Sequence, residues 1–363
     1  MKSKKFVMHG LRRNMFNSLL NEGMVIIMKN AIVFGATGQL GCYSALALRE
    51  NGYNVYAVGR RESDNGFFAT KDIIYIGGVT LEDKSTFENL PKEKFDVVVN
   101  MAGTMPAHAD RNMMPYVQSI VVGIVNVTDW MKTVDCERII FNTTPSDTAE
   151  YWGTDIPIED DVVRSFPKNG NDHAVYTICK RAACDILEHL QICGEVKPCI
   201  FRHFMVYGWH PVATYYLEGE ERVLPWRSMI RRCIHNETLE IYGDPTKKKE
   251  LLYIKDFARA VVIAAENEAC GIFNLPGFKP YSLDEMCNGI LNNFAVDKTN
   301  KKYRPDMPDT PQILLSHEKS KSILGWEPIW TWDEACADMR KEAIENPIEL
   351  LWGKLADEDI IEG

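Results

Sequence analysis

The chain has 363 residues, of which 45% are hydrophobic and 25% charged, and its formal net charge at pH 7 is −10. This is the composition of an ordinary globular protein, and the length permits two domains. The negative charge argues against a nucleic-acid-binding surface, which needs clustered cations, and no apolar run approaches the roughly 20 residues of a membrane helix. The ten cysteines are scattered, with no C-x-x-C pair and no histidine at zinc-ligand spacing. We therefore expect no metal site, reduced thiols and a cytoplasmic location.

Residues 1–27 are basic and contain a single acidic residue, Glu22. A transit peptide is the alternative interpretation, although the segment includes neither a long apolar region nor a small-residue cleavage site for secretion. Because Met28 leads directly into the first predicted strand, we interpret residues 1–27 as a dispensable extension.

The most informative stretch is 31–41, with the sequence AIVFGATGQLG. A short apolar run ends at Gly35, and glycines recur at Gly38 and Gly41 before a helix-like segment, 42–50. In a dinucleotide-binding turn, the first glycine permits the tight turn, the second leaves room for phosphates beside the main chain, and the third lets the helix pack on the strand. The N–H groups of the first helical turn then face the anion. An ordinary strand–helix turn is the alternative.

Apolar runs alternate with helical patterns through the first half of the chain. This alternation predicts right-handed β-α-β units and an α/β, Rossmann-like, doubly wound parallel sheet in a dinucleotide-binding domain at 28–205. A smaller irregular lobe at 206–345 is expected to bind substrate, with some segments returning to the first domain, followed by a tail at 346–363. After the first strand, the predicted strands are 54–59, 72–77, 95–102, 138–144 and 198–205, and the predicted helices are 115–132, 173–190, 226–235 and 255–266.

Tyr176 and Lys180 are four residues apart, so on a helix their side chains share one face. A tyrosine with a pKa near 10 is a poor base, but an ammonium about 4 Å away at an effective dielectric near 20 stabilises the phenolate by up to about 4 kcal/mol. We therefore expect Lys180 to lower the pKa of Tyr176 and make it an acid/base. Thr144 ends a predicted strand, where its hydroxyl could hold the substrate oxygen, although Thr143 and Ser146 offer hydroxyls nearby. Without Thr144 and the glycine turn earlier in the chain, Tyr176 and Lys180 would be interpreted as a pair on the surface of a helix with no catalytic role.

Taken in this order, the motifs resemble the extended short-chain dehydrogenase/reductase family, specifically its nucleotide-sugar epimerases, dehydratases and reductases. The resemblance runs from Met28 to Trp330. The turn matches G-x-x-G-x-x-G, and Thr144, Tyr176 and Lys180 match the family's Ser/Thr and Tyr-x-x-x-Lys set. Further matches are the segment under the cofactor at 100–103 and the landmarks of the substrate lobe at 201–208, 240–244, 251–260 and 320–328.

The resemblance implies which residues form the site. Thr144, Tyr176 and Lys180 would be catalytic. The implied cofactor-binding residues are Gly35, Thr37, Gly38, Gln39, Leu40, Gly41, Arg60, Arg61, Gly78, Met101, Ala102, Gly103, Tyr176 and Lys180, and the implied substrate-binding residues are Thr104, Thr144, Ser146, Met205 and Lys249.

Three of these positions depart from the family pattern. Met205 stands where an asparagine is usual, Lys249 where a phosphate-binding arginine is usual, and Gly78 where an aspartate often lies near the adenine. Lysine still binds phosphate as a point charge, but without the guanidinium fork. The run 247–249 is otherwise expected to be a solvated loop. His203 and His210 are expected near the cleft, where a lone histidine is more often structural than catalytic.

The residues after the second strand favour NADP over NAD. An acidic residue there would bind the ribose hydroxyls of NAD, whereas this chain has Arg60 and Arg61. Two guanidinium groups suit a 2′-phosphate. The alternative is a solvated charge pair, with Glu62 as a complication.

The resemblance leaves several reactions to choose between. The family's 4,6-dehydratases place Asp-Glu directly after the catalytic threonine, whereas Thr144 precedes Pro145 and Ser146, so dehydration is disfavoured. An epimerase of a nucleotide-linked sugar, acting through a transient keto intermediate, fits the broader resemblance, while the arginine pair favours an NADPH-dependent reductase of a keto sugar. A non-catalytic NADP-binding sensor is the alternative of another class. Helices at 113–132 and 173–190 resemble those that form a four-helix dimer interface in the family, so we expect a homodimer.

Overall fold

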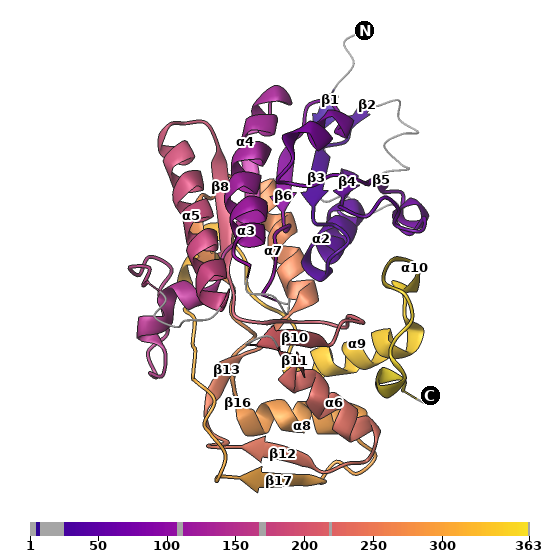
Figure 1. The fold of residues 1–363 in the computed structure, drawn as a ribbon, viewed down its shortest axis with the longest axis vertical. Coiled ribbons are helices and arrows are strands. Elements are labelled where there is room, and N and C mark those ends of the chain that lie inside the picture. Colours follow the sequence, from indigo (N-terminus) through magenta and orange to yellow (C-terminus); the bar gives the residue numbers. More distant parts are fainter. Residues whose placement is uncertain (1–4, 8–24, 107–111, 167–171, 218–219, 362–363) are drawn as a thin grey trace.

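The computed structural model describes residues 5–7, 25–106, 112–166, 172–217 and 220–361. One parallel sheet with helices on both faces forms the larger part of the molecule, and a second lobe lies beyond the carboxyl ends of its strands (Figure 1). This arrangement confirms the predicted α/β, Rossmann-like fold.

The central sheet has seven strands in the order β15-β8-β7-β6-β3-β4-β5. Every neighbouring pair is parallel. The order runs outward in both directions from β3, which places the turn after β3 beside the point where the winding reverses, the usual place for a ligand in such sheets. The strands are β3 (Asn30–Phe34), β4 (Asn54–Val58), β5 (Ile74–Ile76), β6 (Val97–Asn100), β7 (Arg138–Asn142), β8 (Lys197–Arg202) and β15 (Gly271–Asn274).

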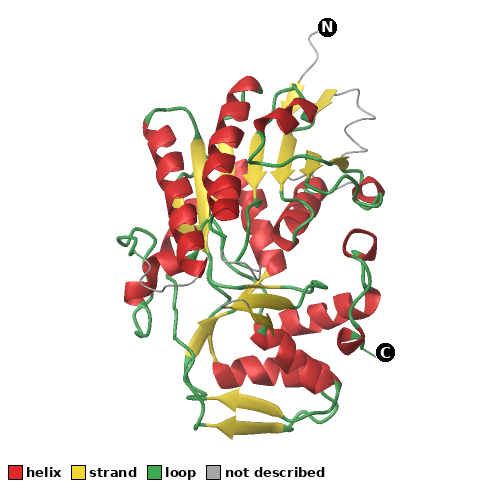
Figure 2. Cartoon of the chain, in the orientation of Figure 1, coloured by secondary structure: helices red, strands yellow, loops and turns green. Residues whose placement is uncertain are grey.

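Helices cover both faces of this sheet, which is why its strands are apolar on both sides (Figure 2). On one face, α2 (Gln39–Glu50) packs against α7 (Ile254–Glu266), so a helix from the second half of the chain completes the first domain. On the other face lie α4 (Gly123–Thr133) and α5 (Asp172–Ile192). Alternate residues of β3 serve the two cores: Val33 faces the first and Ile32 the second.

The helix predicted at 115–132 is a helical run with a π-helical interruption. It consists of α3 (Met114–Tyr116), the π-helix η3 (Val117–Val122) and α4. Ser119 lies in the interruption, where its Oγ donates to the carbonyl oxygen of Pro115 (2.6 Å) and accepts the N–H of Thr104 (2.9 Å). Such side-chain bonds compete with the regular helical ladder, and π-bulges often mark functional positions.

The second lobe is built from short two-stranded pairs around three helices. The pairs are β10–β11, β12–β17, β13–β16 and β14–β9. Its strands are β9 (Val206–Tyr207), β10 (Thr214–Leu217), β11 (Glu220–Val223), β12 (Leu239–Tyr242), β13 (Lys248–Glu250), β14 (Leu252–Tyr253), β16 (Pro280–Ser282) and β17 (Lys301–Arg304), and its helices are α6 (Pro225–Ile234), α8 (Leu283–Phe294) and α9 (Trp332–Glu345).

The structure also contains short helical turns. The 3₁₀ turns are η1 (Phe68–Lys71), η2 (Lys84–Asn89), η4 (Pro145–Tyr151) and η6 (Asp357–Asp359), η5 (Ser320–Leu324) is a π-helical turn, and α10 (Glu349–Trp352) precedes η6. Of the N-terminal extension, the structure describes β1 (Lys5–Val7) paired with β2 (Val25–Ile27), and the rest lies outside the described residues. In the described part of the chain, no helix combines the length and apolarity needed to span a bilayer. All ten cysteines are described, and each is a free thiol.

Candidate active site

The turn after β3 excludes side chains at its glycines. Gly35 has φ +75°, and a Cβ there would lie 2.7 Å from the amide nitrogen of Ala102. A Cβ on Gly41 would lie 2.2 Å from the carbonyl oxygen of Gly35, so only glycine lets α2 pack this closely on β3. A Cβ on Gly38 would approach that same oxygen at 3.4 Å and no other described atom within 4 Å. The main chain at Gly38 is therefore open to a ligand.

Helix α2 begins directly after this turn with its first N–H groups uncapped by any described side chain, and its first turn contains no acidic residue. Uncapped N–H groups and the positive end of the helix dipole attract an anion. The open backbone at Gly38 and this helix end therefore fit the pyrophosphate of a dinucleotide.

A cavity of about 510 Å³ opens at the carboxyl ends of β3, β4 and β6. Its size is within the range of cofactor sites, and its wall combines apolar strand ends with the glycine turn. Of the residues predicted to bind cofactor, it is lined by Gly35, Thr37, Gly38, Gln39, Leu40, Gly41, Arg60, Arg61, Met101, Ala102, Gly103 and Lys180.

Helix α5 carries Tyr176 and Lys180 on the face that packs toward the sheet, and both are buried. The Nζ of Lys180 donates to the carbonyl oxygen (2.9 Å) and the Oδ1 (3.2 Å) of Asn142, at the end of β7. It also lies 4.3 Å from the ring centroid of Phe141 and 5.9 Å from that of Tyr176. Lys180 thus reaches the cavity from α5 while two neutral oxygens hold its ammonium.

The expected lowering of the Tyr176 pKa is wrong for the protein alone. Burial raises the pKa of Tyr176 above its usual value, and burial lowers the pKa of Lys180 to about 8. The reason is that desolvation disfavours the charged form of each group, and Asn142 supplies no negative charge to the lysine. The phenol is thus held protonated, as a proton donor requires.

Thr144 follows β7 and begins the turn η4, in which its Oγ1 accepts the N–H of Ser146 (3.3 Å). Both hydroxyl-bearing residues therefore belong to one capped turn at the carboxyl edge of the sheet. Thr144 is buried.

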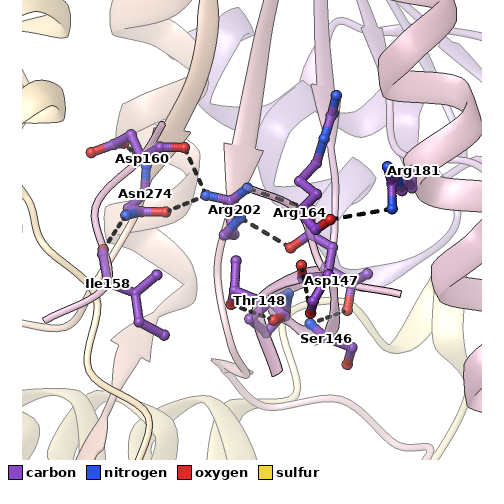
Figure 3. A network of polar contacts seen from close by, with 12 residues as sticks. Ser146, Asp147, Thr148, Ile158, Asp160, Arg164, Arg181, Arg202 and Asn274 are labelled. Atoms are coloured by element: carbon purple, nitrogen blue, oxygen red, sulfur yellow. Dashed lines mark hydrogen bonds and ion pairs between the residues drawn. The ribbon is translucent and has the colours of Figure 1, made fainter. Parts of the chain in front are cut away.

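A buried ion pair holds this turn against the sheet (Figure 3). The carboxylate of Asp147 accepts from the Nε (3.2 Å) and one terminal nitrogen (3.4 Å) of Arg202, at the end of β8, and both side chains are fully buried. The other terminal nitrogen of Arg202 donates to the carbonyl oxygen of Asp160 (3.0 Å) and to the Oδ1 of Asn274 in β15 (3.3 Å). The loop that carries Thr144 is thereby tied to the two outermost strands on its side of the sheet.

The model of the family described as "NAD dependent epimerase/dehydratase family" matches residues 31–275, which is more than half of the chain. The chain belongs to this family. Among curated relatives, it is 25% identical to the UDP-glucose 4-epimerase of Pisum sativum, over 91% of this chain and 99% of that protein. It is 25% identical to the UDP-glucuronate 4-epimerase of Thermodesulfobacterium geofontis, over 74% of this chain and 77% of that protein.

Solved structures of sugar-nucleotide epimerases share this fold. The UDP-N-acetylglucosamine 4-epimerase from Bacillus cereus has a TM-score of 0.69 and 21% identity, covering 87% of this chain and 96% of that one. The UDP-glucose 4-epimerase of Thermotoga maritima, solved with UDP-glucose, has a TM-score of 0.67 and 20% identity, covering 86% and 97%. The UDP-glucuronic acid 4-epimerase from Bacillus cereus, solved with NAD, has a TM-score of 0.63 and 17% identity, covering 91% and 99%. The protein is thus an NAD(P)-dependent enzyme of the extended short-chain dehydrogenase type.

In this epimerase/dehydratase-family member, Arg60 and Arg61 both line the cavity and are exposed. One terminal nitrogen of Arg61 donates to the carbonyl oxygen of Leu351 (2.8 Å). Arg60 has no hydrogen bond or ion pair with any described residue. The carboxylate of Glu62 lies close to Gly78. A Cβ added to that glycine would be 3.0 Å from each of the two carboxylate oxygens.

Gly78 is not among the residues that line the cavity, and its expected role in cofactor binding stays a prediction. Its neighbours Val79 and Leu81 do line the cavity, and Gly78 has φ +69°, a conformation that favours glycine in a turn. Tyr176 is also not among the lining residues, and its ring centroid is 5.9 Å from the Nζ of Lys180, which does line the cavity.

The substrate-binding residues proposed for this family member are less closely grouped. Thr104 lines the cavity, and its Oγ1 is within hydrogen-bond distance of the Ser119 Oγ (3.0 Å). Met205 is half-buried against the first core, and Lys249 lies in β13, paired with Tyr281. The expectation of a solvated loop at 247–249 is therefore wrong for its last two residues, which form strand. Burial lowers the pKa of Lys249.

Several lining residues were not predicted from the sequence. Ser119 reaches the cavity from the π-helical interruption and Asn142 from the end of β7. His210 lines it from the other lobe, as expected of a histidine near the cleft. Asn142 is the last residue of the apolar strand that Thr144 follows. This position at a strand end was the one feature of the sequence that could have indicated that Asn142 belongs to the site. His203 is buried against Phe257, and burial lowers its pKa to about 4.

Proposed function

We propose that the protein is an epimerase of a nucleotide-linked sugar that acts through a transient keto intermediate. The observation that supports this most is that Lys180, four residues after Tyr176 on α5, reaches a cavity lined by the glycine turn and bonds the end of β7, which Thr144 follows. The relatives named as UDP-sugar 4-epimerases support the same reaction class.

In this mechanism the chain's own residues hold the substrate oxygen and move its proton. The Thr144 hydroxyl fixes the oxygen of the reacting carbon, and Tyr176 exchanges a proton with that oxygen as the carbon is oxidised and reduced again. The Nζ of Lys180 is bonded to Asn142 and lies 5.9 Å from the ring centroid of Tyr176, where its charge favours the phenolate whenever the proton has left. The bound nicotinamide would supply the hydride acceptor and donor.

The decisive experiment has two parts. Mass spectrometry of the small molecules released on denaturation should find oxidised NAD or NADP in stoichiometric amount, as a self-contained epimerase requires. Incubation with UDP-glucose and UDP-N-acetylglucosamine in D₂O, followed by proton NMR, should give the 4-epimer of one of them with no deuterium at carbon 4, because the same hydride returns. Deuterium at that carbon, or turnover only with added NADPH, would contradict the proposal.

We further propose that NADP is the preferred cofactor. Arg60, which lacks a partner among the described residues, and Arg61 both line the cavity beyond β4, where charge-assisted hydrogen bonds to a 2′-phosphate are available. Calorimetric titration should give tighter binding of NADP⁺ than of NAD⁺. Equal affinities, or tighter NAD⁺ binding, would assign the arginines to solvent.

The arginine pair also favours the second candidate, an NADPH-dependent reductase of a keto sugar. The same three catalytic residues serve a single hydride transfer. A protein that purifies without cofactor and binds NADPH far more tightly than NADH would favour the reductase over the epimerase.

Tyr176 separates both enzymes from a non-catalytic NADP-binding protein. Tyr176→Phe removes the proton donor and keeps the ring, so we expect turnover to fall by about 10²- to 10⁴-fold with cofactor affinity unchanged. Turnover at the level of the unaltered protein would remove Tyr176 from the mechanism, and absence of turnover in both proteins would favour the sensor.

A homodimer is part of the proposal. Val122, Val125 and Ile178 are exposed on η3, α4 and α5, on the helices expected to form a four-helix interface. Covering such apolar side chains stabilises a dimer. Light scattering at micromolar concentration should give the dimer mass, and Val125→Asp should give the monomer mass.

The ten free thiols support our proposal of a reducing, cytoplasmic location, which cell fractionation would test.

A further inference from the structure

The last part of the described chain lies against the cofactor turn. We call residues 349–359, which comprise α10 and η6, the C-terminal strap. It follows α9 of the second lobe and returns toward α2 of the first domain (Figure 1). None of the motifs found in the sequence includes it.

Trp352 is the tip of the strap. Its Nε1–H donates to the carbonyl oxygen of Thr37 (2.9 Å), in the middle of the glycine turn. Its ring centroid is 4.4 Å from that of His210 and 6.2 Å from that of Tyr43 in α2. Burial lowers the pKa of His210 to about 4, so at neutral pH a neutral imidazole packs against the indole, at an interplanar angle of 59°. Thr37 and His210 both line the cavity, which means that Trp352 touches its wall from outside at two places.

The main chain of the C-terminal strap accepts hydrogen bonds from two side chains, those of Arg61 and Asn65. The carbonyl oxygen of Leu351 accepts from Arg61 (2.8 Å), and that of Leu350 accepts from the side chain of Asn65 (2.9 Å). Arg61 would otherwise be a long exposed side chain with many rotamers, whose ordering on ligand binding costs conformational entropy. The strap meets part of this cost before any ligand arrives.

The far end of the strap is anchored by charge. Asp359 is fully buried and forms ion pairs with Arg227 (2.7 Å) and Arg231 (2.9 Å) of α6. Arg227 in turn donates to the carbonyl oxygen of His210 (2.6 Å), and its guanidinium lies 3.9 Å from the ring centroid of Trp209. The anchor and the tip therefore converge on His210, on the cavity wall.

We propose that the C-terminal strap is a component of the cofactor site, in which Trp352 is a positioning residue for the Thr37 turn and the Leu351 carbonyl positions Arg61. The proposal rests on the binding of NAD or NADP in this cavity. The strap fixes the turn and Arg61 in place, so a cofactor binds to groups that are already ordered, which raises affinity without a direct contact.

The test compares two tryptophan variants that lose the same kind of hydrogen bond. Trp352→Phe keeps an aromatic ring and removes the bond to Thr37. Trp332→Phe removes an equivalent bond, from Nε1 to the carbonyl oxygen of Met286 (2.8 Å), within the second lobe. Calorimetric titration should show NAD⁺ and NADP⁺ binding about 3- to 10-fold weaker in Trp352→Phe and unchanged in Trp332→Phe. Unchanged affinity in Trp352→Phe, or an equal loss in both variants, would overturn the proposal.

Hydrogen exchange without cofactor provides the second measurement. Peptides covering 35–41 and 59–66 should exchange faster in Trp352→Phe than in the unaltered protein, and as before in Trp332→Phe. Equal exchange in all three proteins would show that the strap does not hold these segments. A protein that binds neither cofactor would refute the proposed function, while the exchange comparison would still decide the role of the strap. A lack of NADP preference would leave the NAD⁺ titration to decide it.

Discussion

The two regions that meet at the candidate active site are held in place in opposite ways. The cofactor turn takes its shape from main-chain bonds between near neighbours, such as Gly38 N–H to the Gly35 carbonyl oxygen (3.0 Å), and from the absence of side chains at its glycines, and Trp352 adds one distant bond to it. The Thr144 turn is fixed by a buried carboxylate whose partner, Arg202, is 55 residues away in the chain. The first region depends on space and the second on a charge pair, so they should respond differently to substitution.

The largest effect is expected at the ion pair. Asp147→Asn would leave the buried Arg202 without its counter-charge, which should lower the free energy of unfolding by about 3–5 kcal/mol. Asp129→Asn is the matched control, because Asp129 pairs with Lys84 at the surface (2.8 Å) and should cost less than about 1 kcal/mol. Urea unfolding of both variants measures the difference. Similar losses in the two variants would contradict a special role for the buried pair.

Lys180 is a buried cation without a charged partner among the described residues of this site, since its hydrogen bonds go to neutral oxygens of Asn142. Its pKa falls from 10.5 to about 8 in the folded protein. Between these values the unfolded chain binds more protons, so this group makes stability rise with pH from about 8 to 10.5, by roughly 3 kcal/mol in all. Lys180→Met removes this contribution. Subtracting the unfolding free energies of the two proteins across that pH range isolates it, and a flat difference would refute the prediction.

Glycine substitutions test the cofactor turn. Gly41→Ala forces a Cβ onto the Gly35 carbonyl oxygen and should cost about 1–3 kcal/mol of stability or more. Gly38→Ala meets little in the free protein, so its stability should hardly change while cofactor affinity falls, since the added methyl group occupies the space beside the phosphates. Thermal unfolding and calorimetric titration separate the two effects. Loss of stability at Gly38 with affinity retained would reverse this interpretation.

The smallest effect is expected at Arg60, an exposed residue of the cavity wall. Arg60→Ala should weaken NADP⁺ binding about tenfold, the equivalent of about 1.4 kcal/mol, and leave NAD⁺ binding unchanged. Arg60→Lys keeps the charge without the planar fork and should fall between the two. Titrations of both cofactors at fixed ionic strength measure this. Equal losses for NAD⁺ and NADP⁺ would mean that Arg60 does not discriminate between them.

These differences explain how far the sequence could be interpreted. The spacing of Gly35, Gly38 and Gly41 is local and follows from backbone geometry, and the alternation of strands and helices predicts the sheet, so both could be read along the chain. The partnership of Asp147 with Arg202 joins segments far apart, and no local pattern marks it. The pKa of Tyr176 could not be derived from the Tyr-x-x-x-Lys spacing either, because burial and the capture of Lys180 by Asn142 are properties of the folded chain.

The strand order has a consequence for how the chain folds during synthesis. β15 pairs with β8, and the whole segment from β9 to α7 lies between them in the sequence. Until that segment has left the ribosome, β8 is an edge strand with unpaired backbone groups, and α2 lacks its neighbour α7. An unprotected edge invites pairing with other chains. The first domain therefore cannot complete its folding before the segment from β9 to β15 has been synthesised, and ribosome-associated chains truncated before Gly271 should be the most dependent on chaperones.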